Sequence, residues 1–98
     1  MMWAQIIKVS PQYGALVVYD SSAGYTITVT ALDEKGDFTS RKYYADTKEY
    51  EIQGRKKYAA IFPALPPGNY YVSGWDKNVS SWGKRVTVFP NMIAEVSP

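Results

Sequence analysis

Residues 62–75 read FPALPPGNYYVSGW, and this stretch decides the fold. Pro67 restricts its own φ to about −65°, which suits the second position of a β-turn. Gly68 tolerates the positive φ that a type II turn requires at the third position. The sequence therefore predicts a type II turn over residues 66–69, joining one apolar strand to a second, aromatic strand.

Side chains alternate between the two faces of a strand, so the turn also fixes which rings share a face. Tyr70 and Val72 lie on one face of the outgoing strand together with Gly74. Tyr71, Ser73 and Trp75 lie on the other face. We expect the first face to lie in the core and the second to face solvent.

The remaining chain consists of short β patterns bounded by Gly, Pro, Asn and Ser, with no amphipathic helical pattern. Asp33 to Asp37, with three carboxylates and Gly36, are typical of a turn rather than of a calcium loop. Residues 45–57 fit either a polar edge strand centred on Tyr50 and Ile52 or a mobile loop. The expected strands are residues 5–9, 15–19, 25–31, 38–44, 58–62, 70–75, 85–89 and 92–96. Seven or eight strands in 98 residues indicate a single domain, residues 1–98, folded as a sandwich or small barrel.

The composition excludes several kinds of chemistry. The chain contains no Cys and no His, so it lacks a thiolate nucleophile, an imidazole base and the usual zinc ligands. The sequence shows no nucleophile paired with a general base, and no Gly-rich loop that would bind phosphate. We therefore expect a protein that is not an enzyme and that needs no cofactor or metal.

The Leu-Pro-Pro-Gly-Asn-Tyr motif at residues 65–70, followed by a last pair of strands around Pro90 and Asn91, resembles the prealbumin-like β-sandwich domains. These include the carboxypeptidase regulatory-like domain and the collagen-adhesin B-type repeat. The resemblance covers roughly residues 14–97, and its specific part is residues 58–75. It implies an all-β, antiparallel, seven- to eight-stranded immunoglobulin-like sandwich in which Tyr70 points inward beneath the turn.

Two activities known within that group fit these residues poorly. The transthyretin-related hydrolases use histidines, which this chain lacks. The adhesin repeats often join Lys to Asn by an amide bond, promoted by a buried Glu. The corresponding position here is Gly74, so we expect no crosslink, although Lys8 and Asn91 could supply its two ends.

Aromatic residues are the strongest candidates for ligand binding. Exposed Tyr and Trp stack on sugar rings or anchor a protein partner, because they offer a large rigid surface at low entropic cost. The alternative is that both faces of these strands are covered, or that the rings pack in cross-strand pairs. The candidate residues are Tyr71, Trp75, Trp82, Tyr43 and Tyr44. They predict an accessory or interaction module that binds carbohydrate or a protein.

The region 41–58 supports a second hypothesis, a small β-barrel that binds single-stranded nucleic acid. Arg41-Lys42-Tyr43-Tyr44 and Arg55-Lys56-Lys57-Tyr58 interleave cations with aromatics, as such surfaces do. Acidic residues lie among them, and the net charge is only +2. Lysines on an edge strand also block aggregation. We therefore rank nucleic acid below carbohydrate or protein.

Nothing in the sequence indicates a signal peptide or a membrane span. We expect a soluble chain, either cytoplasmic or a fragment of a secreted or surface protein, so the compartment stays open. An exposed edge strand would also allow a homo-oligomer. Asn78-Val79-Ser80 matches a glycosylation acceptor, a pattern that arises often by chance.

Overall fold

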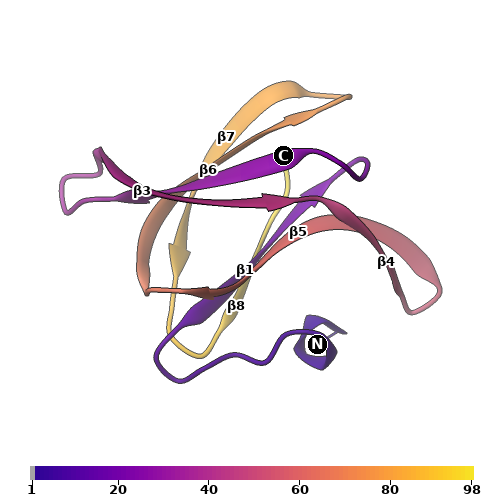
Figure 1. Cartoon of the computed structure of the whole chain (residues 1–98), viewed down its shortest axis with the longest axis horizontal. Helices are drawn as coiled ribbons and strands as arrows, with labels where there is room; N and C mark the ends of the chain where they lie inside the picture. Colours follow the sequence, from indigo (N-terminus) through magenta and orange to yellow (C-terminus); the bar gives the residue numbers. More distant parts are fainter. Residues whose placement is uncertain (1) are drawn as a thin grey trace.

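The computed structural model describes residues 2–98, and it is all-β apart from one short 3-10 helix. Figure 1 shows the course of the chain from the N-terminal helix to the last strand. Helix η1 spans Met2–Gln5. The strands are β1 (Gly14–Asp20), β2 (Thr26–Leu32), β3 (Phe38–Asp46), β4 (Lys48–Ile52), β5 (Arg55–Leu65), β6 (Gly68–Asp76), β7 (Ser80–Val88) and β8 (Ile93–Val96).

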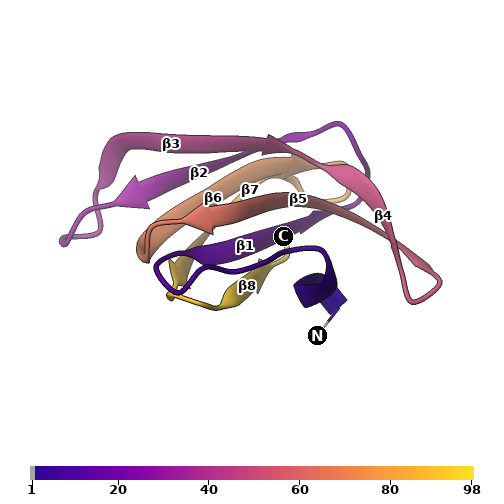
Figure 2. The same ribbon diagram turned by 60° about the horizontal axis from the view of Figure 1, so that its bottom comes forward.

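The strands form two four-stranded sheets, with the orders β4-β5-β1-β8 and β3-β2-β6-β7. All pairs are antiparallel except β1 and β8, which run parallel. Figure 2 shows the two sheets as stacked layers, with η1 on the outer side of the β4-β5-β1-β8 sheet. The expectation of an all-β sandwich is confirmed at this level.

The core lies between the sheets and follows from strand alternation. In β2, Ile27, Val29 and Ala31 are buried, while the threonine at 26 is exposed and that at 28 is half-buried. The inner faces of the other strands contribute the rest of this cluster. Its buried members are Leu16, Val18, Ile27, Val29, Ala31, Ala60, Phe62, Leu65, Tyr70, Val72, Val88 and Val96. Burial of these side chains stabilises the packing of one sheet on the other.

The corner at Pro66-Pro67-Gly68 exists, but it is not the type II turn that the sequence predicts. Gly68 has a φ of +156°, whereas the third position of a type II turn requires about +80°. The backbone bends at Pro67, and Gly68 already pairs with Val88 as the first residue of β6. Pairing with β7 holds the backbone of Gly68 in an extended conformation, so the chain bends less tightly here than in the predicted type II turn.

Below this corner, Tyr70 is only 2% exposed, and its hydroxyl donates a hydrogen bond to the carbonyl oxygen of Pro66. The inward position expected for Tyr70 is thus confirmed. The predicted alternation also holds, because Val72 is buried on the same face while Trp75 is exposed on the other.

Residues 45–57 contain an edge strand, β4, between the end of β3 and the start of β5, and are not a mobile loop. β4 pairs with the start of β5, with Ile52 opposite Arg55. Gln53 and Gly54 join them with φ values of 53° and 76°, as in a two-residue type I′ hairpin. The side chain of Ile52 is buried and that of Tyr50 is half-buried, as the edge-strand alternative requires.

The strand expected at residues 5–9 is wrong. Gln5 ends η1, and the following residues are irregular. Both edges of β1 are already occupied, by β5 and β8, so the N-terminal segment cannot add a strand beside it. Instead Trp3 and Ile7 pack on the outer face of that sheet, in a second buried cluster with Ala15, Val17, Ile52 and Ala59.

Candidate ligand-binding face

The candidate site is the outer face of the β3-β2-β6-β7 sheet. Thr28 pairs with Ser73 on one side and with Tyr44 on the other, while Ser73 also pairs with Gly83. Side chains directly opposite each other on paired strands share a face, so these four positions form one row across the sheet. The adjacent row holds Lys42, Thr30, Tyr71 and Arg85, and the row on the other side holds Asp46, Thr26, Trp75 and Ser81.

Packing against its neighbours fixes the ring of Tyr71, which is half-buried. It lies 5.1 Å from the ring of Phe38, centroid to centroid, at an interplanar angle of 37°. On its other side it covers Gly83, because a Cβ added there would lie 1.8 Å from the Tyr71 hydroxyl oxygen. Only glycine permits this close approach, so Gly83 helps to set the position of the ring.

Trp75 is the more exposed ring of the pair, with 45% of its surface accessible. Its indole packs against Tyr25, at a centroid distance of 5.2 Å and an interplanar angle of 59°. Aromatic pairs at this separation are favourable, and the contact restricts how the indole can turn. Trp75 is therefore both exposed and supported.

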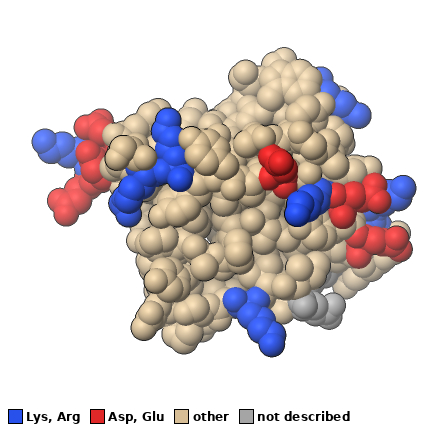
Figure 3. Space-filling model, viewed as in Figure 1, with Lys and Arg blue, Asp and Glu red and all other residues tan. Residues whose placement is uncertain are grey.

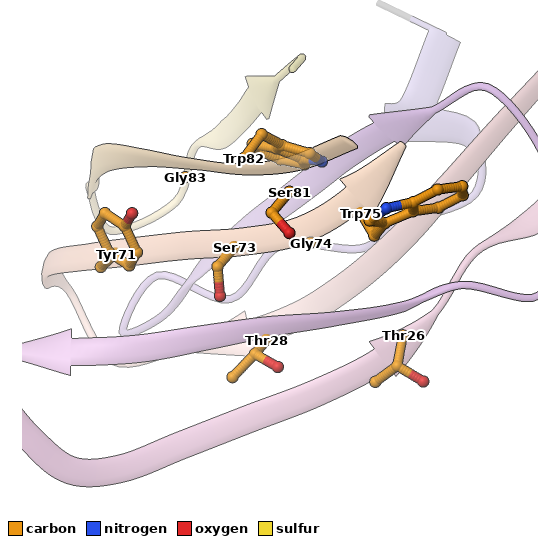
Figure 4. Close-up of a pocket in the computed structure, with 9 residues that line it drawn as sticks. All are labelled: Thr26, Thr28, Tyr71, Ser73, Gly74, Trp75, Ser81, Trp82 and Gly83. Atoms are coloured by element: carbon orange, nitrogen blue, oxygen red, sulfur yellow. The ribbon is translucent and has the colours of Figure 1, made fainter. Parts of the chain in front are cut away.

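Between these two rings lies an open groove of about 580 Å³. Figure 4 shows Tyr71 and Trp75 at its two ends, with the hydroxyls of Ser73, Ser81, Thr28 and Thr26 between them. Thr26 donates a hydrogen bond of 2.7 Å to Asp46 Oδ1. The residues that line the groove are Thr26, Thr28, Tyr71, Ser73, Gly74, Trp75, Ser81, Trp82 and Gly83, none of them charged.

The five candidate residues do not share one face. Tyr71, Trp75 and Tyr44, the last 63% exposed, lie on the outer face. Tyr43 lies on the inner face, where its ring packs against Tyr70 at 6.3 Å. Tyr43 and Tyr44 are consecutive in β3, so they cannot point the same way.

Trp82 is also on the inner side, half-buried against the core between the sheets. It pairs with Gly74, which has no side chain and so leaves room for the indole. Its Nε1 is buried and has no hydrogen-bond partner within residues 2–98. In Figure 4 it stands on the opposite side of β7 from Ser81 and reaches the groove only at the edge of the sheet. The structure thus brings Tyr71 and Trp75 together on the outer face, whereas Trp82 packs mainly against the core and contributes only to the edge of the groove.

The sequence alone did not indicate that Tyr25 and Phe38 pack against Trp75 and Tyr71, or that hydroxyl groups line the groove between these rings. The hydroxyl groups could have been recognised in part, because threonines alternate with apolar residues at positions 26, 28 and 30. The pattern indicates a half-buried strand with one hydroxyl-bearing face, but it does not indicate which aromatic rings flank the hydroxyls. Tyr25 and Phe38 left no comparable signal, since each contacts a ring that is distant in the sequence.

The basic residues of region 41–58 are divided between the two sheets. Arg41 and Lys42 belong to β3, whereas residues 55–57 belong to β5. Lys56 lies opposite Glu51, and the Lys57 ammonium lies 5.9 Å from the ring of Tyr19. Figure 3 shows acidic and basic side chains intermixed at the two ends of the molecule, with a largely uncharged face between them. The continuous basic surface that a nucleic-acid interface requires does not form on this face.

Two carboxyl groups meet at the ends of β1 and β6. The backbone N–H of Ser21 lies 2.6 Å from Asp20 Oδ1 and 3.1 Å from Asp76 Oδ2. Burial, and then the neighbouring carboxyl of Asp76, raises the pKa of Asp20. The backbone N–H of Asn78 donates to Asp76 Oδ1 at 2.8 Å and lowers the pKa of Asp76. Because the pKa of Asp20 is raised and that of Asp76 is lowered, Asp20 takes up a proton before Asp76 as the pH falls.

Other candidate features add no chemistry to this face. Asp33 Oδ1 accepts hydrogen bonds from the backbone N–H groups of Lys35 and Asp37, as expected for a turn. Lys8 and Asn91 line one groove on the other sheet, which has no carboxylate in its lining. Among residues 2–98, no three His, Cys, Asp or Glu side chains are arranged to hold a metal. No helix within the described chain is long and apolar enough to span a membrane.

The fold and the groove together define a two-sheet β protein with an aromatic and hydroxyl-rich outer face. Comparisons with protein-family models, with curated proteins and with solved structures find no match for the chain.

Proposed function

We propose that this chain is a non-catalytic β-sandwich module that binds carbohydrate through the groove between Tyr71 and Trp75. The observation that carries the proposal is the pairing of two supported rings with a floor of hydroxyl groups. Aromatic faces stack on the apolar faces of sugar rings, and hydroxyls both donate to and accept from sugar hydroxyls. Because the rings are held before binding, little conformational entropy is lost on binding.

A fold of the immunoglobulin-like, prealbumin-like type remains part of the proposal. Its support is the Leu-Pro-Pro-Gly corner with the buried Tyr70 bonded to Pro66, in a chain of two four-stranded sheets. Domains of this kind serve as accessory modules, which agrees with the absence of His and Cys from the sequence. Without His, the chain has no imidazole that could activate a nucleophile.

A protein partner is the second candidate, and a specific observation favours it. Phe38 and Tyr44 are 61% and 63% exposed on the sheet that carries the groove. Aromatic side chains of this kind are enriched in protein interfaces. A homo-oligomer would instead pair the free edges of β3 or β7, where Lys42 and Lys84 oppose such pairing.

The proposal is tested by screening the chain against a panel of immobilised oligosaccharides and then titrating the ligands that bind. Trp75→Ala should abolish or strongly weaken binding, because it removes one wall of the groove. Phe89→Ala is the matched control, since Phe89 is 56% exposed but lies outside the groove. Binding that survives Trp75→Ala, or a panel on which no sugar binds, would refute carbohydrate recognition here. An oligonucleotide titration run in parallel tests the nucleic-acid alternative.

A further inference from the structure

We infer that the ligand of this groove is a neutral oligosaccharide that lies along β6, and not an anionic glycan or a single sugar. The inference rests on the proposed function and specifies its ligand. Three features of the groove support it: its charge, its length and the state of its hydroxyl groups.

The charge of the groove argues against an anionic ligand. None of the lining residues is charged. The nearest charged positions on this face are the ends of the flanking rows: Arg85 next to Tyr71, Lys42 across Thr30 from Tyr71, and Asp46 opposite Thr26 in the row of Trp75. Arg85 donates a hydrogen bond to the Gly36 carbonyl oxygen at 3.1 Å, which directs its guanidinium toward the β2–β3 loop. A glycan with repeated negative charges would meet no cation along the groove floor, since Lys42 and Arg85 lie only in the row of Tyr71 and the Asp46 carboxylate lies in the row of Trp75.

The length of the groove argues against a single sugar. Tyr71 and Trp75 are four residues apart on one strand, so their Cα atoms are separated by about 13 Å at a rise of about 3.3 Å per residue. One pyranose ring is much shorter than this. A ligand that contacts both rings must therefore contain several linked sugars and run along the strand.

The hydroxyl groups of the floor are available for a ligand. Within residues 2–98, the side chains of Thr28, Ser73 and Ser81 make no hydrogen bond to another protein group, whereas Thr26 is bonded to Asp46. Each free hydroxyl offers one donor and two acceptor positions. The small side chains in the middle and the large rings at the ends give the floor the shape of a shallow trough (Figure 4).

The test titrates the chain with a neutral linear hexasaccharide such as cellohexaose, its disaccharide, and an anionic hexasaccharide such as oligogalacturonate. Each titration is run at low and at high salt. We expect the neutral hexasaccharide to bind at least about tenfold more tightly than the disaccharide. Its affinity should change less than about twofold with salt, because no ion pair forms.

Two variants link binding to the groove. Ser73→Val replaces a floor hydroxyl by an apolar side chain that suits a strand, and should weaken the neutral hexasaccharide about tenfold. Ser40→Val is its control, because Ser40 is exposed on β3 outside the groove. Gly83→Ala should also weaken binding without replacing either aromatic residue, since the new Cβ would displace the Tyr71 ring from its position at the end of the groove. Circular dichroism checks that each variant is folded.

The outcomes separate this inference from the proposed function. Tight, salt-dependent binding of the anionic hexasaccharide without binding of the neutral one would overturn the neutral ligand and leave carbohydrate recognition standing. Equal affinity for the disaccharide and the hexasaccharide would overturn the extended ligand. Failure of all three sugars, or binding to the neutral hexasaccharide that is unaffected by Ser73→Val and Gly83→Ala, would overturn the use of this groove altogether.

Discussion

The hydroxyl of Tyr70 donates a hydrogen bond to the carbonyl oxygen of Pro66, four residues earlier on the other side of the corner. The ring of Tyr70 lies among the core residues between the two sheets. Burial, and then the neighbouring Tyr43, raises the pKa of Tyr70 above its ordinary value of 10.0, so the hydroxyl keeps its proton further into the alkaline range. One side chain thus connects the bend between β5 and β6 to the core. The same bend sets which residues of β6 face outward into the groove.

Tyr70→Phe removes this hydrogen bond while keeping the ring. We expect the free energy of unfolding to fall by about 1 kcal/mol, the usual net contribution of one hydrogen bond, with a further cost if the Pro66 carbonyl is left without a partner. Urea denaturation measures the change. Tyr43→Phe is the control, because the Tyr43 hydroxyl makes no hydrogen bond within the described chain. Equal stability of the two variants would show that the corner does not depend on the hydroxyl.

The strands could be predicted from the sequence because the residue patterns that specify them lie within short stretches of the chain. Residues 25–31 alternate threonine with apolar side chains, and the Pro-Pro-Gly corner separates two apolar runs. The position of Trp75 on the outer face also follows from the sequence, because Trp75 is an odd number of residues from the inward-facing Tyr70 and an even number from Tyr71. The type II turn was wrong because a neighbouring strand, β7, pairs with Gly68 and extends it.

The full site could not be predicted, because it depends on contacts between strands. Which face of β7 carries Trp82 is decided by its register against Gly74. The support of Trp75 comes from Tyr25, fifty residues away in the chain. The N-terminal segment has an apolar pattern compatible with a strand, but the free edges of the finished sheets determine whether it can pair.

Gly68→Ala tests the strain at the corner. No atom lies within 4 Å of an added Cβ, so any cost comes from the backbone φ of +156° and not from a clash. Residues other than glycine rarely adopt such a conformation, and we expect a loss of about 1–3 kcal/mol in the free energy of unfolding. Gly54→Asn is the control, since Asn tolerates the left-handed φ of 76° in the β4–β5 turn. If Gly68→Ala is as stable as Gly54→Asn, the corner relaxes at little cost.

Asp20→Asn should stabilise the protein at neutral pH. The pKa of Asp20 is higher in the folded chain than its ordinary value of 3.8, so its contribution to stability is present below that value and is lost as the pH rises through the folded pKa. Asparagine removes the buried charge and keeps an oxygen for the Ser21 N–H. The advantage of the variant over the wild type should therefore shrink as the pH is lowered through the pKa of Asp20. Thermal unfolding at several pH values measures this.

Asp76→Asn is the matched variant with the opposite sign. The pKa of Asp76 is lowered, so its contribution is present above the ordinary value and is lost as the pH falls through the folded pKa. We expect this variant to be less stable than the wild type at neutral pH, and the difference to disappear in acid. If both substitutions change stability in the same direction at neutral pH, the opposite pKa shifts assigned to Asp20 and Asp76 are wrong.

Trp3→Ala tests whether the N-terminal segment is an integral part of the fold. Trp3 is fully buried, its indole N–H donates to the Tyr19 hydroxyl at 2.6 Å, and its ring contacts Tyr50 edge-on at 5.4 Å. Removing a buried Trp side chain costs about 3–5 kcal/mol where the site cannot collapse. We expect a loss near the lower end of this range, because a short segment can shift to fill part of the space.

Ile6→Ala is the control, since Ile6 belongs to the same segment but is 49% exposed, and it should cost less than about 1 kcal/mol. Denaturant titration of both variants measures the difference. If Trp3→Ala costs as little as Ile6→Ala, residues 2–9 do not stabilise the sheet on which they pack.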